Sequence, residues 1–404
     1  RRTRDHVIRR ELKFAEQDAY DQDRVNMAQR NLFQTGYFSN VSITDTPAEE
    51  LGKVDLNINV EEVSTGSISV GGGFSTVDKL QFEAGYTETN LFGTGNYFGI
   101  NLNLSQMTKV YNVTLSNPYF LGRELFASAS VYRRDSGASN LSNYTLYKNL
   151  EQGISTSIGY RLTDYLSQRW GYSLFYRNIY EVDPNVSLSI RELAGTSFIS
   201  ALSHTIAYNN TDNAVFATRG FDTSLTTEYA GLFGDSNYIK NTFKSIWYYS
   251  LYEDVVFSAL GSVGAINGLN GQNVKIIDKY NLGGPTLRGF KIGANYGGIG
   301  PMDAETGESL GGKYMFRGSF QVETPMPGVK QYGLLVYTFT DFGTVTDFSN
   351  NPAILDSGTV RVSAGVGLSW RSPMGIISLD LGFPVKKDPG DATEVIFLNF
   401  GTRI

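Results

Sequence analysis

An alternation of apolar and polar residues runs through most of this 404-residue chain and limits what it can fold into. From residue 66 onward, segments such as 98–105, 154–162 and 362–371 carry an apolar side chain at every second position. A period of two places the two sets on opposite faces of a β-strand. We count about sixteen such segments, and an even number is typical of single-chain outer-membrane barrels. The pattern predicts a mainly β fold.

Two β architectures fit this alternation, a soluble sandwich or propeller and a transmembrane barrel. The polar face is rich in Gly, Ser, Asn and Thr rather than Lys and Glu, as expected of a barrel lumen, and Tyr and Phe cluster near the strand ends. A propeller would show a repeat of about 40–45 residues, which we do not find. No run of about 18 apolar residues predicts a transmembrane helix. We therefore expect a closed antiparallel transmembrane barrel of about sixteen strands, in which no strand edge faces lipid unpaired.

The composition changes near residue 63. About a third of the first 63 residues are charged, against about 16% of the rest, and the glycines are concentrated in the second part. We expect two domains, 1–63 and 64–404. The first should be a small α+β domain with helices capped by Asp5 and Asp21, the first of them extending through Phe14, followed by two strands. A two-stranded sheet is marginal, so a strand of this domain is expected to precede Arg1.

The composition also excludes several kinds of chemistry. The chain has no cysteine and two histidines, so it offers no thiolate site and little basis for a histidine metal site or a His-based triad. Its net charge of -6 and pI near 5.2 argue against nucleic acid as a partner. There is no P-loop, and acidic pairs such as Glu61-Glu62 are best explained as solvated edges. We expect no enzyme activity, no cofactor and no metal.

Several motifs, taken in order, resemble the outer-membrane insertase superfamily. The central one is Leu287-Arg288-Gly289-Phe290, which is similar to the signature in that family's long loop. The N-terminal segment resembles the last polypeptide-transport-associated (POTRA) repeat. The other matching segments are 65–67, 90–96, 212–220, 340–345 and 370–375. The order and spacing of these segments cover essentially the whole chain.

The long loop is expected at about residues 267–311, which hold 45 residues and 11 glycines. Loops beyond about 12–15 residues are usually functional or disordered, and a floppy extracellular loop is one alternative. The resemblance implies instead that the loop folds into the lumen, with Arg288 pairing with Asp341. An unpaired acid facing lipid would cost about 2–4 kcal/mol at worst, which independently places Asp341 on the lumen side. Gln321 stands where the family often has Glu.

The resemblance also implies a weak seam between the first and last barrel strands, expected at 66–74 and 395–404. The first of these strands contains three consecutive glycines, Gly71, Gly72 and Gly73. Close packing against a neighbouring strand is the alternative explanation for them. A barrel closes only if these two strands pair, and glycines bring no side chain to that pairing. The last residue departs from the Phe or Trp usual in the family. The seam residues predicted are Ile68, Val70, Gly71, Gly72, Gly73, Leu398, Phe400, Gly401 and Ile404.

As a function, the resemblance implies a factor that folds and inserts β-barrel proteins into the bacterial outer membrane through this seam, with the first domain in the periplasm. Expected partners are unfolded outer-membrane proteins, accessory lipoproteins and the lipid bilayer. A secretion transporter of the same superfamily remains an alternative, as do a porin-like channel and an outer-membrane enzyme. The number of POTRA repeats before residue 1 would separate insertase from transporter.

Overall fold

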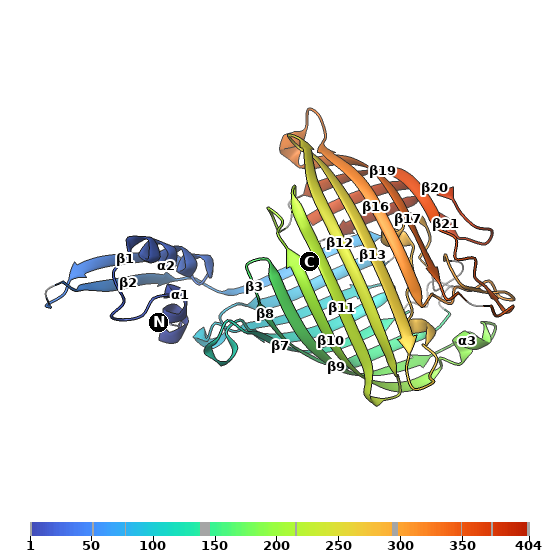
Figure 1. Ribbon diagram of the computed structural model, residues 1–404, viewed down its shortest axis with the longest axis horizontal. Helices are drawn as coiled ribbons and strands as arrows, with labels where there is room; N and C mark the ends of the chain where they lie inside the picture. The colour runs from blue at the N-terminus through green and yellow to red at the C-terminus, as the bar shows by residue number, and fades with distance from the viewer. Residues whose placement is uncertain are drawn as a thin grey trace.

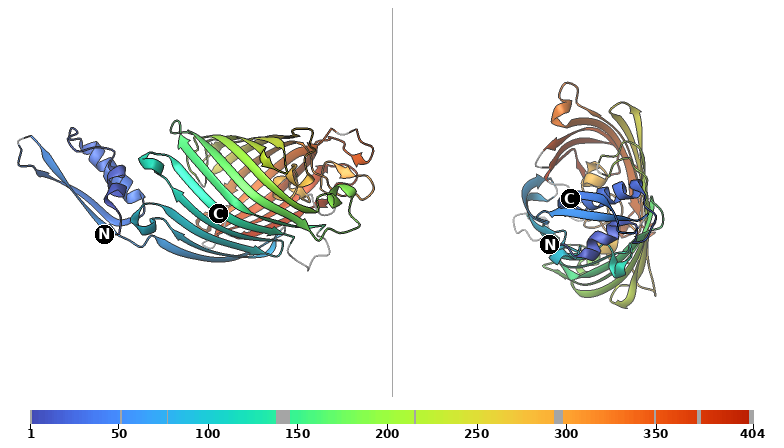
Figure 2. Two further views of the ribbon diagram at one scale, coloured as in Figure 1. Left: turned by 90° about the horizontal axis from the view of Figure 1, so that it is seen from below. Right: turned by 90° about the vertical axis from the view of Figure 1, so that its left-hand side faces the viewer.

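The computed structural model describes residues 2–50, 52–76, 78–137, 146–214, 216–292, 298–348, 350–372 and 375–401. It has two parts, a small N-terminal α+β domain and a large β-barrel (Figure 1). The domain projects beyond one end of the barrel (Figure 2). Within the described residues, no helix has both the length and the apolar character needed to cross a membrane.

The N-terminal domain packs helices α1 (Asp5–Leu12) and α2 (Gln22–Gln34) against an antiparallel pair, β1 (Phe38–Pro47) and β2 (Val54–Glu62). As predicted, the Asp21 carboxylate caps α2 by accepting from the backbone N–H groups of Asp23 and Arg24. The expected cap at Asp5 is wrong. Arg4 occupies the cap position without a side-chain hydrogen bond, and α1 ends at Leu12, before Phe14, because Lys13 adopts a left-handed conformation.

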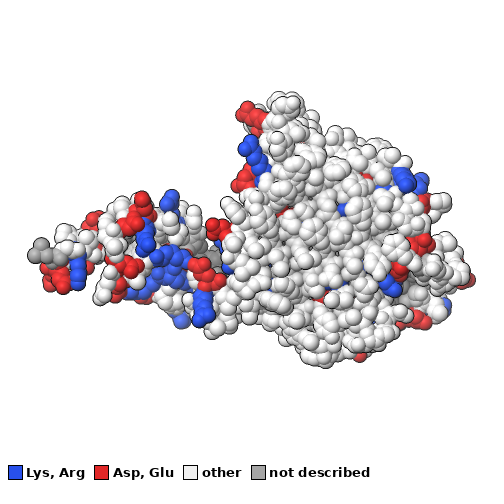
Figure 3. Space-filling model, viewed as in Figure 1, with Lys and Arg blue, Asp and Glu red and all other residues white. Residues whose placement is uncertain are grey.

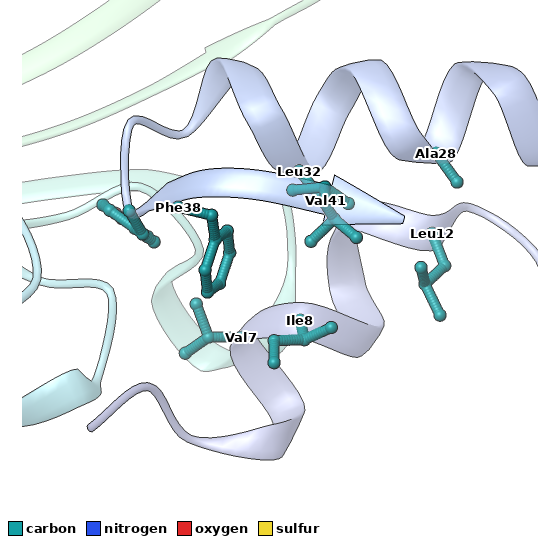
Figure 4. Packing of buried hydrophobic residues seen from close by; sticks show 8 residues of the cluster. Val7, Ile8, Leu12, Ala28, Leu32, Phe38 and Val41 are labelled. Carbon is teal, nitrogen blue, oxygen red and sulfur yellow. The ribbon is translucent and has the colours of Figure 1, made fainter. Parts of the chain in front are cut away.

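The core of this domain lies between the helices and the sheet (Figure 4). Val7, Ile8 and Leu12 follow one face of α1, at the spacing that places residues on one side of a helix. They meet α2 and β1. The residues packed opposite them are Ala28, Leu32, Tyr37, Phe38 and Val41.

In the described part of the chain, sixteen antiparallel strands close into a barrel, which confirms the predicted fold class. Neighbours along the chain pair with each other, and the last strand returns to the first. The strands are β3 (Gly66–Ser75), β4 (Lys79–Glu88), β5 (Tyr97–Ser105), β6 (Thr108–Asn117), β7 (Phe126–Ser136), β8 (Lys148–Arg161), β9 (Leu166–Tyr180), β10 (Gly195–Asn209), β11 (Gly220–Gly234), β12 (Tyr238–Tyr252), β13 (Val255–Gly268), β16 (Tyr314–Pro325), β17 (Leu334–Thr346), β19 (Arg361–Ser372), β20 (Gly375–Lys386) and β22 (Ile396–Gly401).

The alternation in the sequence gives the wall two chemically different faces. Val113 and Val131 are paired across β6 and β7 and are exposed on the outside. On the inside, the neighbouring pair Thr114 and Ser130 joins its hydroxyls at 2.9 Å. The wall visible in Figure 3 carries few charges, whereas the N-terminal domain and the barrel ends carry many. An outer wall with few charges and charged ends suits a bilayer environment.

At the end of the barrel away from the domain, the long connections fold over one another. They contain a short helix, α3 (Leu188–Arg191), and four two-residue strands, β14 (Gly289–Phe290), β15 (Met302–Asp303), β18 (Ile354–Leu355) and β21 (Thr393–Glu394). β14 pairs with β21, and β15 with β18. Long connections of the chain are thus joined to one another by backbone hydrogen bonds.

At the other end, α1 rests on two short turns of the wall. These turns contain the 3-10 helices η1 (Leu91–Gly93) and η2 (Phe120–Gly122). The Arg4 N–H donates to the Gly93 carbonyl at 2.8 Å, and the Tyr119 hydroxyl donates to Glu11 at 3.2 Å. The Arg10 guanidinium lies 4.2 Å from the centre of the Tyr119 ring. The N-terminal domain is therefore held against strands β4–β7, on one side of the barrel end.

Candidate functional site: the loop lock and the seam

The loop between β13 and β16 enters the barrel and contacts its wall at several points. Asp278, in η3 (Ile276–Asp278), accepts from Arg177 of β9 at 2.9 Å, and the hydroxyls of Tyr280 and Thr242 of β12 are 2.8 Å apart. Farther along, Leu287 and Phe290 are completely buried. The described residues of the loop therefore pack against the inner side of the wall.

The structure brings Arg288 and Asp341 into direct contact. Two parallel bonds join them, Nε to Oδ2 and Nη2 to Oδ1, each 2.8 Å long. The Arg288 backbone N–H donates to the same carboxylate at 3.1 Å, and Ser319 of β16 donates to it at 2.6 Å. Asp341 on β17 is 2% exposed. A two-bond arginine–carboxylate pair is both strong and geometrically specific, so it fixes the loop tip at one place on the wall.

Arg288 has further partners on three wall strands. Its Nη1 lies 3.3 Å from Gln321 of β16 and 3.3 Å from Asp380 of β20. Its guanidinium carbon sits 3.4 Å from the centre of the Phe339 ring of β17. We call Arg288, Asp341, Ser319, Gln321 and Asp380 the loop lock.

Asp380 was not predicted from the sequence. Position 321 is a glutamine and carries no charge, so Asp380 is the second acid that faces Arg288. The Tyr337 hydroxyl donates to Asp380 at 2.9 Å. The sequence does contain a feature that indicates a lumen position for Asp380: it stands between Leu379 and Leu381 in a strand where apolar and polar residues alternate. The reasoning that placed Asp341 on the lumen side applies equally to it.

Gly289 allows the loop backbone to pass close to the wall. Its φ is +96°, and an added Cβ would lie 3.0 Å from the Ser363 Cβ and 3.3 Å from the Gly382 carbonyl oxygen. The next residue, Phe290, completes strand β14, which pairs with β21. The loop tip is thus tied by backbone bonds to the segment that leads into β22.

The seam is the junction of β3 with β22. In the described part of the chain, these strands pair at Ser75–Asn399 and Phe74–Phe400, and the Thr76 N–H donates to Leu398 at 3.0 Å. By contrast, the ladder of β3 with β4 runs from Gly66–Glu88 to Ser75–Lys79. Cross-strand pairs contribute about 0.2–1 kcal/mol each, so the two described pairs at the seam and the ten of the β3–β4 ladder set how these residues contribute to closure.

The predicted seam residues fall into two groups. Ile68, Val70 and the three glycines pair with β4, and no described residue of β22 lies opposite them. Leu398 and Gly401 pair with β20. An added Cβ on Gly72 would meet only the Gln81 carbonyl oxygen, at 3.7 Å, within the described residues, so close packing does not require this glycine. Ile404 lies outside the described residues.

The fold and these contacts define a class of protein, a sixteen-stranded β-barrel with a loop held inside the lumen and an α+β domain at one end. The family models agree with this class. The Omp85 superfamily domain matches residues 90–404, and the POTRA model, described as a surface antigen variable number repeat, matches residues 1–63. The chain belongs to the Omp85 superfamily.

Similar curated proteins are outer membrane protein assembly factors named BamA. The one from Neorickettsia risticii is 29% identical over 397 residues, covering 98% of this chain and 52% of the relative. The one from Neisseria meningitidis serogroup B is 28% identical over 446 residues, covering 99% of this chain and 55% of the relative. The chain spans about half the length of the curated relatives it matches.

Solved structures support the fold. BamA from Haemophilus ducreyi lacking POTRA domains 1-3 superposes with a TM-score of 0.86 at 24% identity, covering 99% of this chain and 82% of that one. CdiB from Escherichia coli gives a TM-score of 0.66 at 12% identity, covering 99% and 74%. At these identities the likeness concerns the fold alone.

Proposed function

We propose that this chain belongs to an outer-membrane protein assembly factor that folds and inserts β-barrel proteins through the seam. The observation that carries the proposal is the junction of β3 with β22, at which the described pairs are Phe74–Phe400 and Ser75–Asn399. An exposed strand edge offers N–H and C=O groups to an incoming strand. The names of the curated relatives support the same activity.

The wall next to the seam favours entry from the bilayer. Strands β3 to β6 have 9 or 10 residues, whereas β9 to β12 have 15. Since each strand residue rises about 3.3 Å, the apolar wall is lower on the β3 side. A low wall thins the bilayer beside it and reduces the cost of inserting a client strand there.

The partners follow from this mechanism. Unfolded outer-membrane proteins are the clients, and the bilayer of the bacterial outer membrane surrounds the barrel, with the POTRA domain in the periplasm. The further proposed partners are the accessory lipoproteins of an assembly complex. No step requires a nucleotide or a catalytic side chain, since strand pairing and burial in lipid supply the free energy.

The buried loop separates this function from a diffusion channel. Because the loop occupies lumen space and is fixed by the loop lock, single-channel recordings in planar bilayers should show small, irregular openings. A large and steady conductance would instead support a porin-like channel.

The seam proposal can be tested with disulfides, because the chain has no native cysteine. The register places the cysteines at Phe74 with Phe400, or at Ser75 with Asn399, because these residues lie opposite each other. A matched control places cysteines at Val70 and Ala84, which are paired between β3 and β4. Paired Cα atoms lie within the reach of a disulfide.

Oxidation of either seam pair should stop insertion of a urea-unfolded barrel client into vesicles, and reduction should restore it. Oxidation of the control pair should leave insertion unchanged. Full insertion with the seam cross-link shown to be complete would contradict lateral opening, and would favour transport through the lumen.

A further inference from the structure

The two wall turns beneath α1 share an unusual backbone. Phe92 has φ 52° and ψ 27°, and Leu121 has φ 57° and ψ 28°. Each is followed by a glycine with φ +70°, Gly93 and Gly122. Turns with both central residues at positive φ favour Asn, Asp or Gly at the first position. A bulky apolar residue is strained there, and residues held in strain cluster at sites of function.

The side chains of Phe92 and Leu121 are exposed, whereas other residues of the first turn contact the N-terminal domain. Phe92 is 83% exposed and Leu121 is 78% exposed. In the first turn, Asn90 and Gly93 are buried and bond to the residues that precede α1, through Thr3 and Arg4. The POTRA domain thus covers the turn without covering its apolar tip.

Exposed arginines lie beside the two tips. Arg2 and Arg4 are exposed beside the first turn, since Arg4 bonds to Gly93 and an added Cβ on Gly93 would strike the Arg2 carbonyl. Arg123 follows the second turn and is also exposed. Figure 3 shows Lys and Arg where the domain meets the barrel, with Asp and Glu among them, and Glu124, which follows Arg123, pairs with Lys13. Apolar tips flanked by arginines have the composition of a surface that enters the headgroup layer of a bilayer with anionic lipid.

We propose that Phe92 and Leu121 are a pair of lipid anchors that insert into the leaflet on the POTRA side. The turns end strands that cross the wall, so this leaflet begins at their level. Arg123 and the arginines before α1 bind its anionic phosphates. The anchors hold the β4–β7 wall, and the domain docked on it, at one height beside the seam. The inference rests on the membrane placement proposed above.

Spin labels can measure the depth of each tip. Single cysteines replace Phe92 or Leu121, are labelled with a nitroxide, and the protein is placed in vesicles of phosphatidylethanolamine and phosphatidylglycerol. Leu225→Cys on the outer wall serves as the lipid control, and Met27→Cys on α2 as the water control. Both side chains are exposed.

The tip labels should collide more with oxygen than with a water-soluble nickel complex, as the label at 225 does, whereas the label at 27 should show the reverse. If the labels at 92 and 121 were in water while the label at 225 was in lipid, the anchor proposal would be overturned and the membrane placement would stand. A wall label in water would instead contradict the membrane placement. Tip labels that leave water only when a client is added would assign the tips to client binding and overturn the lipid proposal.

A double variant, Phe92→Asn with Leu121→Asn, separates anchoring from folding. Asparagine suits the first position of these turns, so the barrel should keep its heat resistance in detergent. Client insertion into the same vesicles should slow several-fold. An unchanged insertion rate would overturn the role of the anchors in assembly.

Discussion

At the scale of single residues, Arg288 is held by the wall on several sides. Arg288 bonds to Asp341, Asp380, Gln321 and Ser319, and its side chain is 12% exposed. The pair with Asp341 is expensive to break, because removing one partner leaves a buried charge unpaired. The loop lock should therefore affect both stability and activity.

We predict that Arg288→Ala leaves the barrel folded but lowers its heat resistance and its assembly activity. Loss of one buried partner costs about 3–5 kcal/mol. The cost here should fall at the lower end, since Ser319 still donates to Asp341. Lys291→Ala, an exposed cation of the same loop, is the control and should change neither property. Electrophoretic mobility after heating, together with client insertion, measures both.

The reversed pair, Arg288→Asp with Asp341→Arg, should recover part of the loss. Recovery is incomplete because the new aspartate would stand near Asp380, which already lies 3.3 Å from the Arg288 guanidinium. A variant Arg288→Ala with undiminished melting and activity would contradict the loop lock.

Gly289 gives a second prediction at this scale. Gly289→Ala adds both left-handed strain and contact with Ser363 and the Gly382 carbonyl. Gly307→Ala, in the same loop at φ +72° with nothing within 4 Å, adds strain alone. The first change should lower the melting temperature more than the second. Equal shifts would show that the close approach of the loop to the wall contributes nothing.

At the scale of elements, turn chemistry fixes where strands meet. The connection between β10 and β11 is organised by Asp212, which accepts from the Thr218 hydroxyl at 2.5 Å and from the backbone N–H groups of Thr218 and Arg219. These hydrogen bonds lower the pKa of the Asp212 carboxyl to about 2. The motif from Asp212 to Gly220 therefore has a structural explanation.

A pH dependence follows from that turn. A carboxyl whose pKa is lower in the folded chain stabilises the fold above its ordinary pKa, and this stability is lost as pH falls from about 4 through about 2. Urea unfolding followed by tryptophan fluorescence should show this loss. Asp212→Asn should show a smaller one, since it has no carboxyl to protonate. An identical acid loss in both proteins would contradict the assignment.

The elements also show how far the sequence alone can predict this structure. The alternation of period two predicts the barrel strands, because each must present one face to lipid and the other to the lumen. It cannot predict β14 and β21, because two residues have no period. The sequence likewise cannot predict which residues of β3 and β22 pair at the seam, since this depends on the register between segments separated by more than 300 residues.

The loop lock was predictable in part. Arg288 and Asp341 were identified by resemblance, and the burial of an acid in a strand supported Asp341 independently. Asp380 and Ser319 were not identified, because three-dimensional proximity across β16, β17 and β20 is set by barrel closure. The exposure of Phe92 and Leu121 cannot be predicted either, since a sequence does not show a positive φ at a residue other than glycine.

At the scale of the whole molecule, the lock and the seam are connected through the backbone. The loop tip pairs with β21 through β14, and β21 leads directly into β22. The POTRA domain rests on the turns of β4–β7, beside the other seam strand. The two edges of the seam are therefore each held by a different part of the molecule.

The central claim is that client strands pair with the edge of β3. The direct test places single cysteines at Ile68, Val70 or Gly72 of β3, and at Asn103, a polar residue whose amide bonds to Glu83 across the inner face. A stalled client carries single cysteines along its last strand. Oxidation during assembly should trap the client on β3, in one antiparallel register that advances by two client residues for every two positions of β3, with no trapping at Asn103. Trapping at Asn103 with none along β3 would contradict the account, because it would place the client in the lumen rather than at the seam.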